Sequence, residues 1–168
     1  MKFNWLKIMV ISIAFIMTSS AAMAFDYQDW VPLVPENISE FEKKGEPNGM
    51  NMEKRGQAWS ALEQKYSNKD GDALKLSIVT GKNAPGMQEF KAMKQFKVEN
   101  DKEKTKTLDV KGRNSVLNIK KKAGENSLLI PASDETLVVI ATEAVDSEDE
   151  MTSLAADVPI DDIAAAVE

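Results

Sequence analysis

The sequence predicts an α+β fold, in which helices pack on an antiparallel sheet of about six strands. Three observations predict it. Several segments alternate apolar and polar side chains, a period typical of strands with one buried face. One segment repeats apolar residues at helical spacing, and a capping sequence opens a second helix. The expected order is hairpin, helix, four-strand meander and helix, in one domain over residues 25–168.

Residues 1–24 are predicted to be an export signal. Lys2 and Lys7 form a positively charged region before an apolar run, Ile8 to Met17. The pattern Ala22-Met23-Ala24 then fits a signal peptidase that cuts after Ala24. An uncleaved anchor is the alternative, but a membrane span needs about 20 apolar residues. Without a cysteine to acylate, a lipoprotein is not expected. We therefore expect a periplasmic protein with no membrane span after cleavage.

The composition restricts the chemistry available to the chain. It has 168 residues, no His, no Cys and a net charge of −6, which becomes −8 when the two signal lysines are removed. Thiol catalysis, an imidazole base and a Ser-His-Asp triad are thus excluded. A Ser-Lys pair is conceivable, but no spacing selects one. We expect no enzymatic activity and no cofactor.

The segment before the hairpin is expected to be mostly irregular. Asp26 to Pro35 contains two prolines, which disfavour helix. A short extended piece is expected over Ile38 to Phe41. The following residues, Glu42 to Asn51 (EKKGEPNGMN), are rich in Gly, Pro and Asn and are predicted to be a loop.

A hairpin is predicted over Gly56 to Thr80. Ser67 to Asp72 (SNKDGD) supplies the turn. Period-two alternation on both sides places one apolar set of side chains on a common face. That set is Leu62, Tyr66, Leu74, Leu76 and Ile78.

The first helix is predicted over Met87 to Lys97. Its apolar residues recur every three positions and form one stripe, which consists of Met87, Phe90, Met93 and Phe96. The polar side chains between them are expected to face solvent.

The meander is the strongest pattern in the sequence. Its four strands are predicted over Thr105 to Lys111, Ser115 to Lys121, Ser127 to Ile130, and Thr136 to Ala141. The last strand is apolar on both faces, which predicts that it is the most buried. Ser147 and Glu150 then form a capping box, and Pro159 ends the helix that they open.

Three candidate binding motifs are weak. Gly81 to Gly86 has phosphate-loop spacing but lacks the Lys that should follow, so a loop into a helix is expected. Asn68, Asp70 and Asp72 alternate as in a calcium loop but lack its Gly and Glu, which favours a polar turn. Met50 and Met52 are soft ligands that suit Cu(I), but two thioethers alone are too few ligands to indicate a metal site.

The charge distribution changes sharply along the chain. Residues 91–122 carry eleven basic and four acidic side chains, whereas residues 123–168 carry twelve acidic and no basic ones. One interpretation is a basic face for an anionic lipid, polymer or partner protein. The other, which we favour, is that basic strands and the acidic last helix neutralise each other. The candidate patch consists of Lys111, Arg113, Lys120, Lys121 and Lys122.

The overall pattern resembles a known group. The likeness rests on Val34-Pro35 leading into Phe41, Gly56 to Tyr66 (GQAWSALEQKY), the alternating strand Leu74 to Ile78, the turn Val110-Lys111-Gly112, Leu128 to Ile140 and the closing helix. On these motifs the chain is similar to uncharacterised small exported α+β domains of Gram-negative bacteria. The resemblance implies a fold and an export route, and it implies no activity and no site residue.

The expected function is therefore a non-enzymatic periplasmic domain that binds or supports an unidentified partner. The alternative is a carrier that holds an apolar ligand or lipid between the sheet and the helix Met87 to Lys97, whose Met and Phe side chains suit a variable guest. A carrier should have a continuous apolar cavity of several hundred cubic ångströms. Nucleic acid is not expected, because aromatic and basic residues do not interleave.

Overall fold

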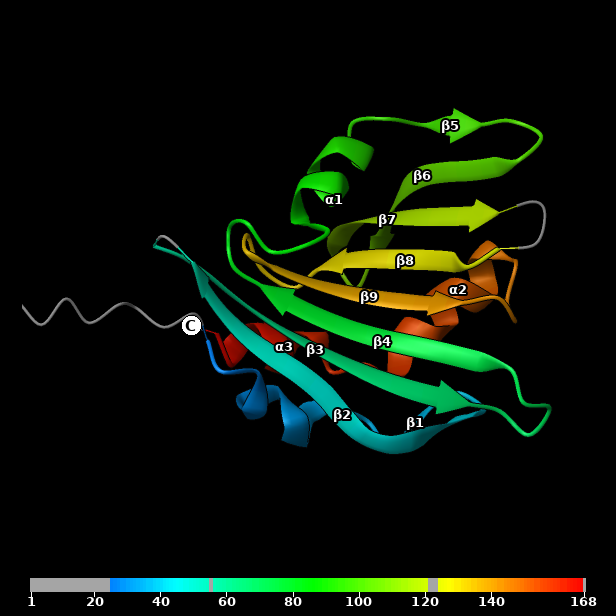
Figure 1. Cartoon of the computed structure of the whole chain (residues 1–168). Helices are drawn as coiled ribbons and strands as arrows, with labels where there is room; N and C mark the ends of the chain where they lie inside the picture. Colours follow the sequence, from blue (N-terminus) through cyan, green and yellow to red (C-terminus); the bar gives the residue numbers. More distant parts are fainter. Residues whose placement is uncertain (1–24, 55, 121–123, 168) are drawn as a thin grey trace, which may run out of the picture.

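The computed structural model describes residues 25–54, 56–120 and 124–167. They form one antiparallel nine-stranded sheet in the order β1-β2-β3-β4-β9-β8-β7-β6-β5 (Figure 1). The strands are β1 Asn37–Ile38, β2 Phe41–Lys54, β3 Gln57–Ser67, β4 Ala73–Thr80, β5 Val98–Glu99, β6 Glu103–Val110, β7 Arg113–Lys120, β8 Asn126–Pro131 and β9 Thr136–Thr142. The expected export signal with its cleavage site, and Lys121 and Lys122, lie outside the described residues.

The prediction of a six-stranded α+β fold is wrong. The part of the chain that the structure describes is mostly sheet, with nine strands and only about 22% helix. The largest error is β2, which occupies the segment predicted to be a loop. Gly45 and Pro47 fall where the register between β2 and β3 shifts, between Lys44 and Asn48. Near the sheet edge such an irregularity tolerates proline, because few ladder hydrogen bonds are lost there.

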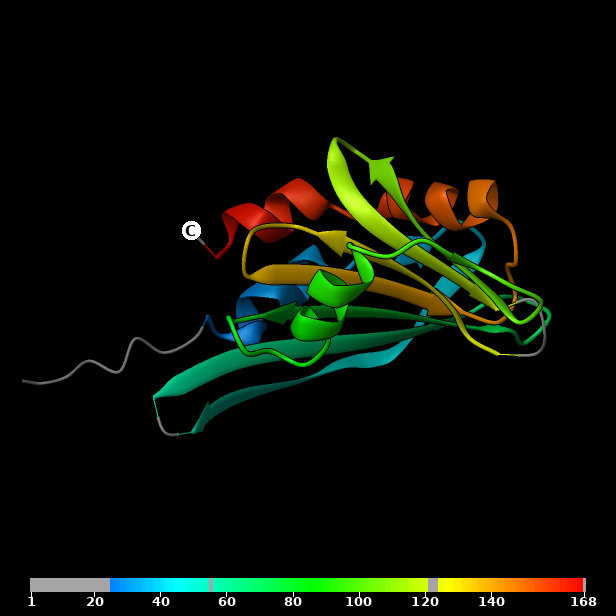
Figure 2. The ribbon, with the colours of Figure 1, turned by 90° about the horizontal axis from the view of Figure 1, so that it is seen from above.

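The helical segments are short and lie on both sides of the sheet. Figure 2 shows α2 and α3 on one side and α1 on the other. Their bounds are η1 Tyr27–Leu33, α1 Met87–Met93, α2 Glu148–Leu154, η2 Ala155–Asp157 and α3 Ile160–Ala165. The expected irregular lead-in is thus a 3-10 helix, which Asp26 caps by accepting a hydrogen bond from the Gln28 N–H.

The sheet face under η1, α2, η2 and α3, here called the closed face, carries the main core. The predicted hairpin set of Leu62, Tyr66, Leu74, Leu76 and Ile78 lies in it, and all five are at most 2% exposed, as the alternation predicted. Trp30 anchors η1 by donating a hydrogen bond from Nε1 to the Ile163 carbonyl. The Tyr66 hydroxyl donates to the Pro35 carbonyl at 2.9 Å, and burial raises the pKa of Tyr66, which keeps this donor protonated.

The strand β9 lies at the centre of the sheet, between β4 and β8. Six of its seven residues are buried, which confirms that it is the most buried strand of the meander. Its closed-face residues, Val138 and Ile140, belong to the main core. Leu137 belongs to a second, smaller cluster on the opposite face.

The opposite face, here called the open face, is covered only in part. Among the described residues its core cluster is small and consists of Val79, Ala84, Met87, Phe90, Val116, Leu129 and Leu137. The helix α1 supplies Met87 and Phe90 but ends at Met93, four residues before the predicted end. Phe96 is consequently 60% exposed instead of completing the apolar stripe.

The C-terminal helices are fixed by local capping and by burial. Ser147 accepts a hydrogen bond from the Glu150 N–H, which confirms it as the N-cap, and its hydroxyl donates to the Glu150 carboxylate at 2.6 Å. The helical region ends before Pro159, as predicted, and a separate helix, α3, then begins at Ile160. Ile160 and Ile163 are at most 1% exposed, so α3 is docked on the core.

Candidate functional site

The open face is hollowed beside α1, and this hollow is here called the helix groove. Its volume is about 340 Å³. One wall comes from the α1 region and the floor from strands β4, β7, β8 and β9. The groove is lined by Lys75, Ser77, Val79, Pro85, Gly86, Glu89, Met93, Asn118, Glu125, Ser127, Leu129, Leu137, Val139 and Ala141. The strands of the floor contribute apolar side chains, Val79, Leu129, Leu137, Val139 and Ala141, together with the polar Lys75, Ser77, Asn118 and Ser127.

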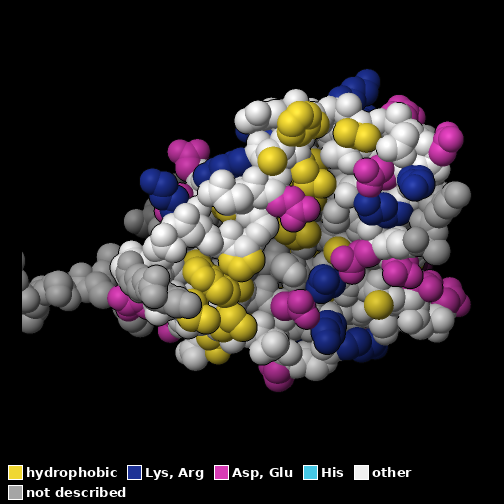
Figure 3. Space-filling model, turned by 45° about the horizontal axis from the view of Figure 1, so that its top comes forward, with side chains coloured by type: hydrophobic (Ala, Val, Ile, Leu, Met, Phe, Trp, Pro, Cys, Tyr) yellow, Lys and Arg dark blue, Asp and Glu magenta, His cyan; other side chains and the backbone are white. Residues whose placement is uncertain are grey.

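A second hollow, here called the edge groove, continues this surface toward the sheet edge. It has a volume of about 230 Å³ and is lined by Asn48, Gly49, Met50, Ala61, Leu62, Glu63, Ser77 and Val79. Ser77 and Val79 line both grooves, so the two meet on β4. Figure 3 shows hydrophobic side chains gathered on this surface, with charged side chains mixed beside them.

A third hollow, here called the polar pocket, lies at the charged end of the helix groove. Its volume is about 340 Å³, and it is lined by Lys65, Asp72, Ala73, Leu74, Lys75, Glu125, Ala141, Thr142, Glu143 and Ala144. Lys75, Glu125 and Ala141 line both the polar pocket and the helix groove. An apolar groove therefore opens at one end into a site with charges of both signs.

A row of lysines crosses the open face beside this pocket. Lys44 of β2 is the cross-strand partner of Lys65 in β3, and Lys65 is the partner of Lys75 in β4. Like charges directly opposite each other destabilise a sheet. Only the outer two have ion pairs: Lys44 with Glu42 at 3.4 Å and Lys75 with Glu125 at 3.5 Å. Lys65 is exposed and makes no ion pair with any described residue.

The loop that precedes α1 shapes the wall of the helix groove. Gly81 has a φ of +117°, and a Cβ there would lie 2.6 Å from the Ala58 carbonyl oxygen. Only glycine fits this close approach. The segment Gly81 to Gly86, which has phosphate-loop spacing, is thus the predicted loop into a helix, and Pro85 and Gly86 line the groove.

The methionine pair considered for copper lies at the edge of the open face. Met50 and Met52 are 50% and 42% exposed and pair across the strands with Ala61 and Trp59. Their side chains share one face, since they are two residues apart in a strand. No group of three or more Asp and Glu residues suited to a metal exists among the described residues. Copper binding at these thioethers stays an untested hypothesis, which the sequence pattern did not favour.

The predicted basic patch is engaged within the domain where it is described. Lys111 donates to the carbonyls of Ala156 and Val158, both at 3.0 Å. Arg113 pairs with Asp161 at 2.6 Å, and Lys120 pairs with Glu103 at 2.6 Å. Lys121 and Lys122 lie outside the described residues. A binding role for the patch stays a prediction, and the contacts of its described members are structural.

The charge switch has a local explanation in these contacts. Lys106 and Lys104 of β6 both pair with Glu148 of α2, at 2.5 Å and 3.8 Å. The hydrogen bond from Lys106 is the main cause that lowers the pKa of Glu148. Basic strands and acidic helices thus lie side by side, which supports the interpretation that they neutralise each other.

The spacing that suggested calcium belongs to a hairpin turn. The Asn68 side-chain oxygen accepts hydrogen bonds from the N–H groups of Asp70 and Asp72, and its Nδ2 donates to the Asp72 carboxylate at 2.9 Å. These contacts form the turn between β3 and β4. The polar turn predicted for this segment is therefore confirmed.

The candidate site was only partly foreseen from the sequence. The stripe of α1 pointed to the helix groove, but the edge groove and the lysine row depend on β2, which was predicted to be a loop. The available signal was the spacing of Met50 and Met52, which is that of one strand face. Lys65 and Lys75 lie in the two strands of the predicted hairpin, but Lys44 joins the row only through the pairing of β2 with β3.

Comparisons of the chain with family models, curated proteins and solved structures find no match. The likeness to exported domains of Gram-negative bacteria thus stays a prediction. Among the described residues, no helix is both long and apolar enough to cross a membrane.

Proposed function

We propose that this protein is a non-enzymatic periplasmic binding domain that carries an apolar chain, such as the acyl chain of an amphiphile. The chain would lie in the helix groove, between α1 and the floor formed by β4, β9 and β8. The observation that carries the proposal is this groove of about 340 Å³. Its size falls within the roughly 300–1,000 Å³ range of small-molecule sites.

The lining of the groove suits an apolar guest. Val139 is partly exposed in the floor, and Met93 is partly exposed in the wall. Thioether side chains adapt to guests of variable shape, because they are unbranched and polarizable. Transfer of an acyl chain from water would contribute roughly 0.8 kcal/mol for each buried CH₂ group.

The form of the open face favours an elongated guest. Ser77 and Val79 join the helix groove to the edge groove, so the track runs across several strands. From β2 to β9 it crosses three strand spacings, a span of roughly 14 Å. A flexible chain can follow such a track.

A second candidate is docking of a protein on the edge of the open face. Met50 and Met52 are the observation that favours it, because large apolar side chains this exposed are typical of interaction surfaces. The two functions differ in the guest: a carrier takes up a small apolar molecule, whereas a docking module leaves the helix groove empty.

The test is native mass spectrometry of the protein with a long-chain monoacylglycerol, an uncharged probe. We expect a 1:1 complex. Ser77→Trp should abolish it, because the indole would block the point where the grooves meet. Thr107→Trp is the matched control: Thr107 is exposed on the same face of β6 and lines none of the three hollows. Absence of a complex, or equal binding by both variants, would refute the carrier function.

A further inference from the structure

We propose that the polar pocket binds a zwitterionic head group, so that the guest is an amphiphile with one phosphate and one ammonium in its head. The inference rests on the proposed function, since the chain of the same molecule would occupy the helix groove. It names the class of ligand, which the apolar groove alone leaves open.

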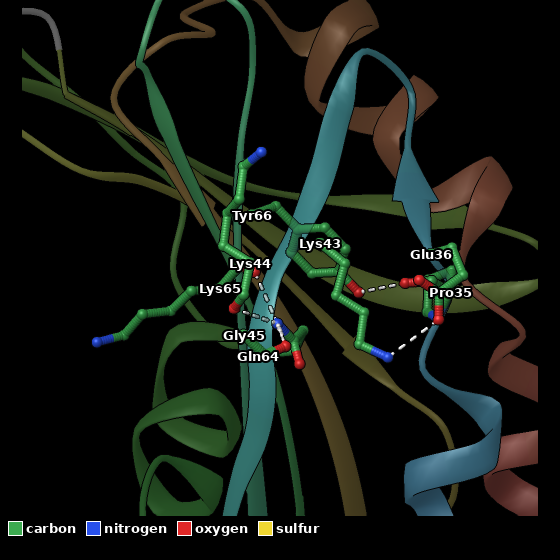
Figure 4. Close-up of polar contacts among 8 residues, drawn as sticks. All are labelled: Pro35, Glu36, Lys43, Lys44, Gly45, Gln64, Lys65 and Tyr66. Atoms are coloured by element: carbon green, nitrogen blue, oxygen red, sulfur yellow. Dashed lines mark hydrogen bonds and ion pairs between the residues drawn. The ribbon is translucent and has the colours of Figure 1, made fainter.

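The cationic half of the pocket comes from the lysine row. Lys65 and Lys75 face each other across β3 and β4, and both line the pocket. Two ammonium groups at directly opposite positions repel each other in the absence of an anion. Figure 4 shows the Lys65 side chain extending away from Tyr66, to the side opposite Lys43, whose ammonium pairs with Glu36. A phosphate between Lys65 and Lys75 would remove the repulsion through charge-assisted hydrogen bonds.

The backbone that presents these lysines is held firmly. The buried Gln64 side chain donates to the carbonyls of Lys44 and Lys65 at 3.0 and 2.7 Å, which ties β2 to β3 where their register shifts (Figure 4). Tyr66, the next residue, is anchored in the closed-face core. Lys65 thus extends from a strand whose neighbouring residues are fixed by these hydrogen bonds and by core packing.

The anionic half comes from three carboxylates in the same pocket. Asp72, Glu125 and Glu143 line it. Glu125 is bound to Lys75, but at 3.5 Å with side chains 52% and 37% exposed the pair is loose. An exposed pair of this kind is worth no more than about 1 kcal/mol, so a ligand can replace it at little cost. Glu143 makes no ion pair with any described residue.

A singly charged head fits this pocket less well. A purely anionic head would be attracted by Lys65 and Lys75 but repelled by Glu125 and Glu143. In a head group with a phosphate and a primary ammonium, the phosphate would bind the two lysines. The ammonium would bind the two glutamates and donate hydrogen bonds to their carboxylates. Lys75 and Ala141 line both the pocket and the helix groove, so head and chain of one molecule can be bound together.

The experiment measures binding by calorimetry, below micelle-forming concentrations, for three amphiphiles with one acyl chain in common. They are lysophosphatidylethanolamine (zwitterionic), lysophosphatidylglycerol (anionic) and a monoacylglycerol (uncharged). We expect the zwitterionic ligand to bind at least about tenfold more tightly than the other two. Free phosphoethanolamine should bind far more weakly, because it leaves the groove empty.

Two variants separate the halves of the pocket. Lys65→Gln should reduce the affinity for both charged ligands and leave that for the monoacylglycerol unchanged, because Lys65 lines the polar pocket but not the helix groove. Glu125→Gln should weaken binding of the zwitterionic ligand and strengthen that of the anionic one, because it frees Lys75 and removes a repulsion. Circular dichroism of each variant checks that the fold is kept.

Each outcome decides a separate question. Equal affinity for the three amphiphiles would overturn the head-group inference and leave the carrier function standing, as would tighter binding of the anionic ligand. Equally tight binding of free phosphoethanolamine would show that the chain plays no part and overturn the inference. If no amphiphile binds, including the monoacylglycerol, the proposed function itself fails.

Discussion

The two faces of the sheet differ in how completely they are covered. Among the described residues the closed face carries a cluster of 24 buried apolar residues, and the open face carries seven. The closed face lies under η1, α2, η2 and α3, whereas the open face has only α1, a helix of seven residues. With no disulfide in the chain, burial on the closed face must supply most of the stability.

This difference separates stability from binding within one sheet. Each strand contributes alternate side chains to the two faces, so one residue packs in the core while its neighbour lies on the open face. In β9, Ile140 lies in the main core, while Val139 is partly exposed in the floor of the helix groove. The predictions below test that separation.

Ile140→Ala should have the largest effect on stability. Ile140 is 0% exposed, and truncation of such a residue costs about 2–5 kcal/mol. Val139→Ala is the matched variant on the other face and should cost under about 1.5 kcal/mol, because its side chain is already partly in contact with water. Urea unfolding followed by circular dichroism measures both values. Equal losses at the two positions would contradict the separation of the faces.

Phe90→Ala should release α1 and leave the rest of the sheet folded. A helix of seven residues is not stable alone, and Met87 and Phe90 are its buried contacts with the sheet. We expect amides of α1 to exchange at least about tenfold faster, a change of about 1.4 kcal/mol in local opening free energy. Hydrogen exchange of β4 and β9 should stay the same; faster exchange there would show that α1 supports the whole fold.

Ser147→Ala should have a smaller effect, confined to the closed face. It removes both hydrogen bonds that join Ser147 to Glu150 at the start of α2. Loss of such a cap costs about 1 kcal/mol. The expected result is a lower midpoint of urea unfolding, with affinity for the monoacylglycerol unchanged. Impaired binding in this variant would mean that the two faces are coupled.

Glu148→Gln should have the smallest effect, and a pH-dependent one. Lys106 lowers the pKa of Glu148 below its ordinary value of 4.5, so the ionised carboxylate stabilises the fold above that value. The contribution is lost as the pH falls through the lowered pKa. At pH 7 the variant should be less stable by under about 1 kcal/mol. The difference should vanish in strong acid, and a constant difference across the pH range would contradict this origin.

The sequence predicted face assignments better than the extent of the sheet. Alternation placed Leu62 and Tyr66 with Leu74, Leu76 and Ile78 correctly, because a period of two directly encodes a buried face. The strand β2 was missed because Gly45 and Pro47 have the composition of a loop, while pairing with β3 extends the chain regardless. A strand with the composition of a loop leaves no local pattern of its own, even when its partner follows it directly in the chain.

The candidate site depended on features that these local patterns do not encode. The Met and Phe stripe foretold a helix over the sheet, but not that it would end at Met93 and leave a groove. The charge distribution suggested Lys111 and Arg113 as part of a binding patch, but both make contacts within the domain. The lysines of the polar pocket, Lys65 and Lys75, lie at polar positions of the two strands of the predicted hairpin, and the register of that hairpin places them opposite each other.

The order of the strands also governs how the sheet can form during folding. The pairs β2–β3 and β3–β4 are local hairpins, and β6 to β9 form a local meander. The two halves join only where β4, ending at Thr80, pairs with β9, starting at Thr136. Closing that long loop costs entropy before any contact repays it, which slows folding. We expect this central seam to form late, and an unjoined β4 would expose an apolar strand edge that favours aggregation during folding.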